Sequence, residues 1–230
     1  MSSIAENLIQ VRQQIKSSLE KTDRESSSVM LLAVSKTRPA EDLRQAYAEG
    51  QRDFGENYLQ ESLEKITALQ DLDISWHFIG PLQSNKTKAV AENFNWMHTV
   101  DRLKIAQRLS DQRPSNLPPL NICVQVNISQ EQSKSGVLPS ELPELIAKIS
   151  ELPNICVRGL MAIPKATENQ KEQQQAFARM QTLLTLLQET HPEMDTLSMG
   201  MSGDMDAAIA EGSTIVRIGT AIFGARPAKD

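Results

Sequence analysis

The first residue in the sequence that could do chemistry is Lys36, which ends an apolar run, LLAVSKTRP. The run is typical of a buried strand that stops before Pro39. Period-2 alternation places Lys36 on the same side of this strand as Leu32 and Val34. A desolvated amine is easier to deprotonate, and a neutral amine attacks an aldehyde to form a Schiff base. The structural alternative is a lysine that turns to solvent or pairs with a carboxylate of a loop.

A turn of small residues follows the apolar run at 195–201. Ser202 is predicted to cap a helix over 203–211, and Gly200 and Gly203 leave room for an anion at the backbone. Backbone N–H groups at such a helix start favour phosphate. The alternative is that these residues serve the turn alone.

The last apolar run, TIVRIGTAIF, contains Arg217 and a second small turn with Gly219 and Thr220. The turn offers backbone N–H groups and a hydroxyl to an anion. A buried guanidinium needs a partner, and Glu56 is one candidate. A ligand with a phosphate, a ring nitrogen and an aldehyde would engage the turns, Arg217 and Lys36 together. Pyridoxal 5′-phosphate (PLP) carries these three groups.

Composition and charge argue against several classes of function. The chain has 230 residues, a net charge of −5 at pH 7, 40% hydrophobic residues and 23% charged residues. Its Lys and Arg residues are dispersed among acids, so no nucleic-acid partner is expected. No stretch approaches a transmembrane span, and the start is typical of an amphipathic helix rather than a signal peptide, so we expect a cytoplasmic protein without a membrane partner.

The cysteines and histidines give no sign of a metal site. Cys123 and Cys156 each lie inside an apolar run, so they are predicted to be buried thiols in a reducing compartment. The three histidines, His77, His98 and His191, are scattered along the chain.

Short β-rich runs alternate with helical patterns along the chain. The expected strands lie near 29–35, 52–55, 75–80, 95–100, 120–128, 155–163, 195–201 and 214–223. Helices are expected near 39–49, 56–70, 83–93, 101–112, 139–151, 168–190 and 203–211, with a further helix at the N-terminus. Strict alternation predicts parallel strands with right-handed crossovers. Eight such units favour a single (β/α)₈ TIM barrel domain over 1–230, with the N-terminal helix in the outer-ring place that the last strand leaves vacant. An open doubly wound sheet is the alternative.

In a barrel of this kind the active face is built from the carboxyl ends of the strands and the loops that follow them. Lys36, the turn at Ser202 and the turn at Gly219 would therefore meet at one end of the molecule.

Several segments of the sequence resemble those of the pyridoxal phosphate homeostasis protein family (the YggS type). They are LLAVSKTRP, FGENYLQE, WHFIGPLQSNK, VNISQEQSKSG, RGLMAIP and SMGMSGDMDAAIAEGSTIVRIGTAIFGAR. The resemblance extends over residues 4–226, and the family in turn is similar to the N-terminal barrel of alanine racemase.

This resemblance implies a role for each site residue. Lys36 would hold PLP as a Schiff base, and Arg217 would face its pyridine nitrogen. Asn57 would sit beside the cofactor, and Met161 would line the pocket. The phosphate would be held by Ser202, Gly219 and Thr220.

The resemblance also implies control of vitamin B6 and PLP pools without an established catalytic activity. Physical reasoning agrees, because only GARPAKD follows the last strand and the second acid/base of a racemase has no obvious source. We therefore expect a PLP carrier with PLP-dependent apoenzymes as recipients, as a monomer or a weak dimer. The alternatives are a PLP-dependent racemase or decarboxylase, a class I aldolase-like enzyme in which Lys36 attacks a sugar phosphate, and a scaffold role.

Lys134, in SQEQSKSG, follows the fifth strand and belongs to the same barrel face. It is a candidate second amine that receives PLP transiently or gates its exit. A solvated loop lysine near Glu131 and Gln132 is the alternative.

Overall fold

The computed structural model describes residues 2–25, 27–131 and 135–225, in which strands and helices alternate. The strands are β1 (Met30–Val34), β2 (Asp53–Glu56), β3 (Ser75–Phe78), β4 (Trp96–Val100), β5 (Leu120–Gln125), β6 (Ile155–Met161), β7 (Thr196–Ser198) and β8 (Ile215–Ile218). The helices are α1 (Ile4–Glu20), α2 (Ala40–Ala48), α3 (Leu59–Ala68), η1 (Ser84–Lys86), α4 (Thr87–Asn93), α5 (Leu103–Gln112), α6 (Leu142–Ser150), α7 (Gln170–Gln188), α8 (Met205–Ala210) and α9 (Thr220–Phe223).

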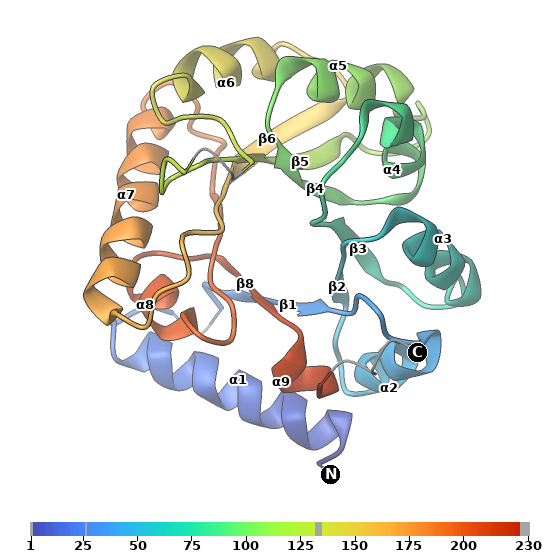
Figure 1. Cartoon of the computed structure of the whole chain (residues 1–230). Coiled ribbons are helices and arrows are strands. Elements are labelled where there is room, and N and C mark those ends of the chain that lie inside the picture. Colours follow the sequence, from blue (N-terminus) through green and yellow to red (C-terminus); the bar gives the residue numbers. More distant parts are fainter. Residues whose placement is uncertain (1, 26, 132–134, 226–230) are drawn as a thin grey trace.

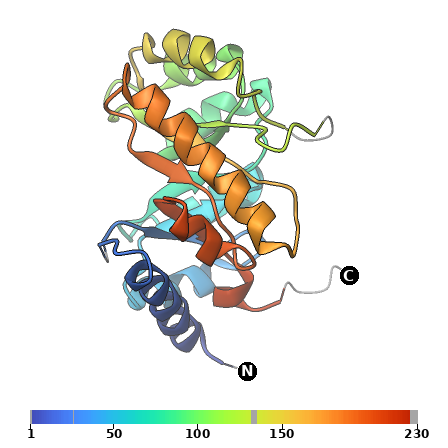
Figure 2. The ribbon, with the colours of Figure 1, turned by 90° about the vertical axis from the view of Figure 1, so that its left-hand side faces the viewer.

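The strands form a closed parallel barrel in chain order, and β8 pairs with β1 (Figure 1). In the register between them, Leu32 lies opposite Arg217. This confirms the predicted TIM barrel, and the open doubly wound sheet is wrong. Figure 2, the side view, shows α7 lying across the outer surface of the strands.

The N-terminal helix α1 closes the ring of helices beside β8 and β1. It packs against α8, α9 and α2, along the lower edge of Figure 1. Its start is fixed by a capping box, in which Ser3 Oγ accepts the N–H of Glu6 and the Glu6 carboxylate accepts the N–H of Ser3. Leu8, Val11 and Leu19 form part of its buried stripe. The helix therefore occupies the place that the last strand leaves vacant, as predicted.

The main apolar core lies between the strands and the helices. Phe54 of β2 and Leu43 of α2 are both fully buried there. Phe78 of β3 meets Phe94, which follows α4, edge to face at 5.4 Å between ring centroids. This shell fixes the strands and so fixes the positions of the residues at their ends.

The interior of the barrel contains polar as well as apolar side chains. Leu32, Ile79 and Ile215 form one small apolar cluster, and Trp96, Cys123 and Met161 form another. By alternation, His77 shares a strand face with Ile79, His98 with Trp96, and Arg217 with Ile215. Several buried polar side chains face the interior, among them His77, His98, Ser198 and Arg217, and Asp53, which contacts His77, is partly exposed.

The structure corrects the prediction for the chain after β8. The strand expected to continue to residue 223 ends at Ile218, and Thr220–Phe223 forms the short helix α9 with Gly219 at its N-cap. Gly219 passes close to β1, since a Cβ placed on it would lie 3.1 Å from the carbonyl oxygen of Val34. The chain turns at this close approach, which places Gly219 and Thr220 at a helix start rather than inside a strand.

The structure also corrects the predicted cap of α8. Asp204, not Ser202, is the N-cap residue, and α8 begins at Met205. The N–H of Met201 donates to Asp204 Oδ1 at 2.6 Å, which closes a turn ahead of the helix. Ser202 lies exposed in this turn. No helix in the described ranges has the length and apolar character needed to cross a membrane.

Candidate functional site

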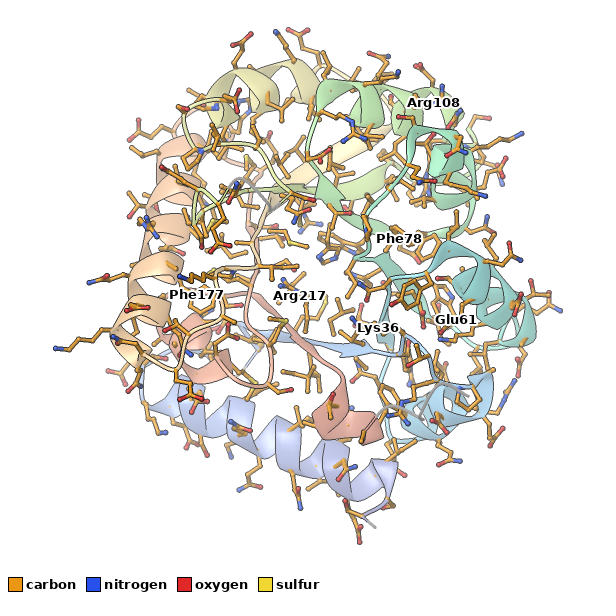
Figure 3. The ribbon with its side chains drawn as sticks, viewed as in Figure 1. Lys36, Glu61, Phe78, Arg108, Phe177 and Arg217 are labelled. Atoms are coloured by element: carbon orange, nitrogen blue, oxygen red, sulfur yellow. The ribbon has the colours of Figure 1, made fainter. Side chains whose placement is uncertain are left out.

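A cavity of about 280 Å³ opens at the carboxyl ends of the strands, where a barrel of this type places its site. Figure 3 shows Arg217 near the middle of the barrel and Lys36 on the side of β1, with Glu61 beyond it. Six residues of the predicted site line this one cavity, and they are Lys36, Asn57, Ser202, Arg217, Gly219 and Thr220. Residues from β1, β2, β7 and β8 and their loops thus meet as the sequence predicts.

Met161 lies elsewhere. It is fully buried in the barrel interior with Trp96 and Cys123 and is absent from the cavity lining, whereas Ile163, two residues further along, does line it. Its contact with a ligand stays a prediction. Lys134 lies outside the described residues, so its role stays a prediction as well.

The backbone on both sides of Lys36 is held by side chains of α3. Lys65 Nζ donates to the carbonyl oxygen of Ser35 at 2.7 Å, and the N–H of Thr37 donates to Glu61 Oε1 at 2.6 Å. Thr37 has a φ of 62°, a left-handed conformation that costs a non-glycine residue about 1 kcal/mol or more. The hydrogen bond from the Thr37 N–H to Glu61 supports this turn, so the direction in which Lys36 leaves the strand is fixed by the structure around it.

Behind this turn lies a buried cluster of charged groups. Lys65 Nζ donates to Glu56 Oε1 at 2.8 Å and to Glu61 Oε1 at 2.5 Å, and Ser35 Oγ donates to Glu56 Oε1 at 2.6 Å. Burial raises the pKa of Glu56, and the neighbouring Lys65 and Ser35 counteract that rise. The sequence suggested Glu56 as a partner for the Arg217 guanidinium, but in the structure Glu56 binds Lys65 instead.

Arg217 is held by groups at the ends of β7 and β6. Its Nη1 donates to Ser198 O at 2.6 Å and to Ser198 Oγ at 2.9 Å, and its Nη2 donates to Ala162 O at 3.0 Å. Desolvation lowers the pKa of Arg217 to about 10, and the nearby Asp204 opposes this shift, so the guanidinium is charged at neutral pH. Of its five N–H groups, Nε–H and one on Nη2 have no acceptor in the described residues, and they remain to donate to a ligand.

The small turns supply the remaining donors. Gly219 and Thr220 stand at the start of α9, where the first N–H groups of a helix have no acceptor within the helix. Ser202 is exposed, and Gly203 beside it has no atom within 4 Å of where a Cβ would stand, so this part of the cavity wall leaves open space. Both turns can accommodate an anion.

Asn57 contributes a polar atom without a partner. Its Oδ1 is buried and makes no hydrogen bond within the part of the chain that the structure describes. Its backbone packs directly on Gly80, where a Cβ would lie 2.1 Å from the Asn57 carbonyl oxygen. An orphaned acceptor on the wall of a cavity indicates a donor that the described residues do not provide.

The donor set of the cavity fits PLP. It comprises an amine, a guanidinium and two small turns, which match the aldehyde, the ring nitrogen and the phosphate of that molecule. Among the described residues, no group of three or more His, Cys, Asp or Glu side chains could hold a metal ion.

The sequence predicted six of the residues that line the cavity but missed the residues that support it. Lys65 stands in the helical pattern LQESLEKITA, which resembles an exposed helix with an ordinary Glu–Lys pair four residues apart. The signal that could have revealed the cluster was Glu56, a carboxylate at the end of an apolar strand that needs a buried cation.

Comparison with known proteins agrees with this geometry. The family model of the alanine racemase N-terminal domain matches residues 7–227. The pyridoxal phosphate homeostasis protein of Pseudomonas aeruginosa is 58% identical over 226 residues, which cover 98% of this chain and 97% of that protein. The solved structure of PipY from Synechococcus elongatus with PLP bound has a TM-score of 0.84 and 39% identity, and the match covers 96% of this chain and 100% of that one. An alanine racemase of Clostridium difficile, at 16% identity and a TM-score of 0.73 over 95% of this chain and 58% of the racemase, shares the fold.

Proposed function

This chain belongs to the pyridoxal phosphate homeostasis protein family, within the wider family of the alanine racemase N-terminal domain, and from this premise we propose that it binds PLP in the cavity at the carboxyl ends of its strands. The protein holds PLP as a Schiff base on Lys36 and contributes to vitamin B6 and PLP homeostasis inside the cell. It does not turn over amino acids.

The observation that carries this proposal is the presence of Lys36 and Arg217 in one cavity, with small turns beside them. Lys36 would supply the amine for the aldehyde, and Arg217 would donate to the ring nitrogen through the N–H groups that have no acceptor among the described residues. The phosphate would be held by Ser202, Gly219 and Thr220. When bound, PLP supplies an aldehyde that can be passed from one amine to another.

Two features support a carrier rather than an enzyme. A positively charged Arg217 disfavours a second positive charge on the pyridine nitrogen, so the ring is a weaker electron sink. The described residues that line the cavity also include no His, Tyr, Cys, Asp or Glu side chain, so none of these lining residues is such an acid/base. A racemase or a decarboxylase would need such a group.

Titration of the PLP-free protein with PLP tests the proposal, with the absorption spectrum as the readout. The wild-type protein should take up one PLP per chain and develop a Schiff-base band, and Lys36→Ala should not develop it. The loaded protein should then racemise and decarboxylate amino acids no faster than free PLP does. Turnover above that rate would make the protein an enzyme, and failure to take up PLP would exclude the carrier.

Location, domain organisation and partners complete the proposal. Cys123 and Cys156 are both unpaired, which supports a reducing, cytoplasmic location. The family match over residues 7–227 supports one PLP-binding domain over 1–230. PLP-dependent apoenzymes are the proposed recipients, and a monomer is the proposed state in solution.

A further inference from the structure

A chain of buried polar side chains runs through the barrel interior from Arg217 toward the amino end of the strands. Arg217 Nη1 lies 2.9 Å from Ser198 Oγ, and Ser198 Oγ lies 2.8 Å from His98 Nδ1. His98 Nε2 lies 3.0 Å from His77 Nδ1, and His77 Nε2 lies 3.1 Å from Asp53 Oδ1. Ser198 ends β7, whereas Asp53 begins β2 and is partly exposed, so the contacts link the cavity to the opposite end of the barrel.

The two ends of the chain fix the direction of its hydrogen bonds when both rings are neutral. A carboxylate can only accept, so His77 is protonated on Nε2 and donates to Asp53 Oδ1, and Ser75 Oγ, 3.1 Å from the same nitrogen, also accepts. His77 Nδ1 then carries no proton and accepts from His98 Nε2. His98 Nδ1 in turn accepts the proton of Ser198 Oγ, which itself accepts from Arg217, since a guanidinium can only donate. One tautomer of each ring satisfies all of these contacts.

We propose that Asp53, His77, His98 and Ser198 form one oriented hydrogen-bond chain that positions Arg217 in the cavity. Ser198 and His98 are then positioning residues, which act on a ligand only through the guanidinium. The effect on PLP binding rests on the proposed function, whereas the orientation of the chain does not depend on any ligand.

The surroundings of the two rings keep them neutral and fixed. Both rings are fully buried, and this desolvation is the main cause that lowers the pKa of each. For His98, the neighbouring His77 and Arg217 lower the pKa further. His77 also stacks on Trp96 at 5.4 Å between centroids, with planes 5° apart, and Arg158 covers the Trp96 ring. The charged or titratable groups that act on this chain or on its immediate neighbours are Asp53, Cys123, Arg158, Asp195, Asp204 and Arg217, whereas Glu56 of β2 binds Lys65 outside the barrel interior.

Protonation would break the chain. A charged His98 carries a proton on Nδ1, so it would donate to Ser198 Oγ and leave the Ser198 proton without its acceptor. A charged His98 would also add a second cation beside Arg217, and the one carboxylate bound to the two rings, that of Asp53, contacts His77 rather than His98. The orientation therefore belongs to the neutral state of both rings.

Nitrogen NMR of the ligand-free protein, labelled in its histidines, tests the orientation directly. At pH 7 the signals of His77 and His98 should both show a proton on Nε2 and none on Nδ1. Ser198→Ala should shift the His98 Nδ1 signal, because that nitrogen loses the hydroxyl that donates to it. A proton on Nδ1 of either ring, or a charged ring at pH 7, would overturn the proposal.

Ser213→Ala is the matched control. Ser213 also has a fully buried hydroxyl, but its partners within the described part of the chain are the carbonyl oxygens of Leu197, Met199 and Ile215. Its removal should leave both histidine signals in place. If Ser198→Ala does not fold, His98→Asn tests the next link of the chain, because it keeps an acceptor for Ser198 near the Nδ1 position and cuts the bond to His77. The His77 signals should then change.

PLP titration tests the positioning role. Loss of one hydrogen bond to a charged group should raise the PLP dissociation constant of Ser198→Ala about tenfold or more, with a changed absorption band, and Ser198→Thr should restore part of the affinity. Unchanged affinity and an unchanged band in Ser198→Ala would overturn the positioning role. If the wild-type protein binds no PLP, the proposed function is wrong. The NMR measurement still tests the orientation of the hydrogen-bond chain, because it uses the ligand-free protein.

Discussion

Lys65 Nζ lies 2.7 Å from the carbonyl oxygen of Ser35, the residue that directly precedes Lys36. The three N–H groups of Lys65 have three acceptors, namely Ser35 O, Glu56 Oε1 and Glu61 Oε1. One lysine is thus committed to holding the backbone beside another. This division explains why two lysines close in space can have different roles, with Lys36 lining the cavity and Lys65 supporting its strand end.

The buried cluster around Lys65 predicts a measurable loss of stability. Lys65→Met should lower the free energy of unfolding by about 3 kcal/mol, because the Glu56 carboxylate stays buried without its cation. The double variant Lys65→Met/Glu56→Gln should lose less than the sum of the two single changes. Urea unfolding of the four proteins measures both quantities.

An exposed ion pair gives the control for that cycle. Lys148 Nζ lies 2.6 Å from Glu144 Oε1 on the outer face of α6. Lys148→Met should leave the urea midpoint nearly unchanged, since exposed pairs contribute little. Equal losses for Lys65→Met and Lys148→Met would contradict the structural role of the buried cluster.

The contact between Gly80 and Asn57 predicts a loss of ligand affinity. Gly80→Ala places a Cβ 2.1 Å from the Asn57 carbonyl oxygen, so the Asn57 backbone and this cavity wall must move. The PLP dissociation constant should rise about tenfold or more, as expected for losing at least one well-placed contact of about 1.4 kcal/mol. Titration below the unfolding temperature of the variant separates this effect from stability, and wild-type affinity there would contradict it.

The two buried histidines predict a pH dependence of stability. Their pKa values are lowered in the folded protein, so they stay neutral while the unfolded chain takes up protons below about pH 6.5. The free energy of unfolding should therefore fall as the pH drops from 6.5 toward 5, by up to about 1.4 kcal/mol per pH unit for each ring. Denaturation at several pH values measures the slope.

His98→Asn isolates the contribution of one ring. Glu56 and Asp204, whose pKa values burial raises, act in the opposite direction but are present in both proteins, so they cancel in the difference. The variant should show a shallower slope between pH 6.5 and 5. A slope equal to that of the wild type would mean that His98 takes up protons as readily when folded as when unfolded.

The cysteines predict selective labelling. Burial raises the pKa of Cys123 to about 12, and it raises that of the half-buried Cys156 as well. Iodoacetamide at pH 8 should therefore modify Cys156 slowly and Cys123 only after unfolding. Mass spectrometry of a time course follows both sites, and equal rates in the native protein would contradict a closed barrel interior.

Several features of the fold followed from the sequence because they depend on local patterns. Alternation of β-rich and helical runs gave the eight strands, and period-2 alternation placed Lys36 toward the cavity. The end of β8 was harder to predict, because IVRIGTAIF is apolar apart from Arg217 and Thr220, and only the close approach of Gly219 to Val34 shows where the strand must stop.

The polar chain in the barrel interior could not be predicted from the sequence. His77 and His98 stand in the runs SWHFIG and NWMHTV, which resemble ordinary strands, and alternation gives their side but not their partners. Ser198 is 100 residues from His98 along the chain. Their contact depends on barrel closure and strand stagger, which no local pattern encodes.

Borohydride reduction of the PLP-loaded protein, followed by peptide mass mapping, tests the central claim most directly. The account predicts that the reduced pyridoxyl group is found on Lys36 and that Lys65 carries none. Lys36→Ala should leave no trapped group, although PLP can still occupy the cavity. A pyridoxyl group on a different lysine of the wild-type protein, or none at all after saturation with PLP, would contradict the assignment of Lys36 as the anchor.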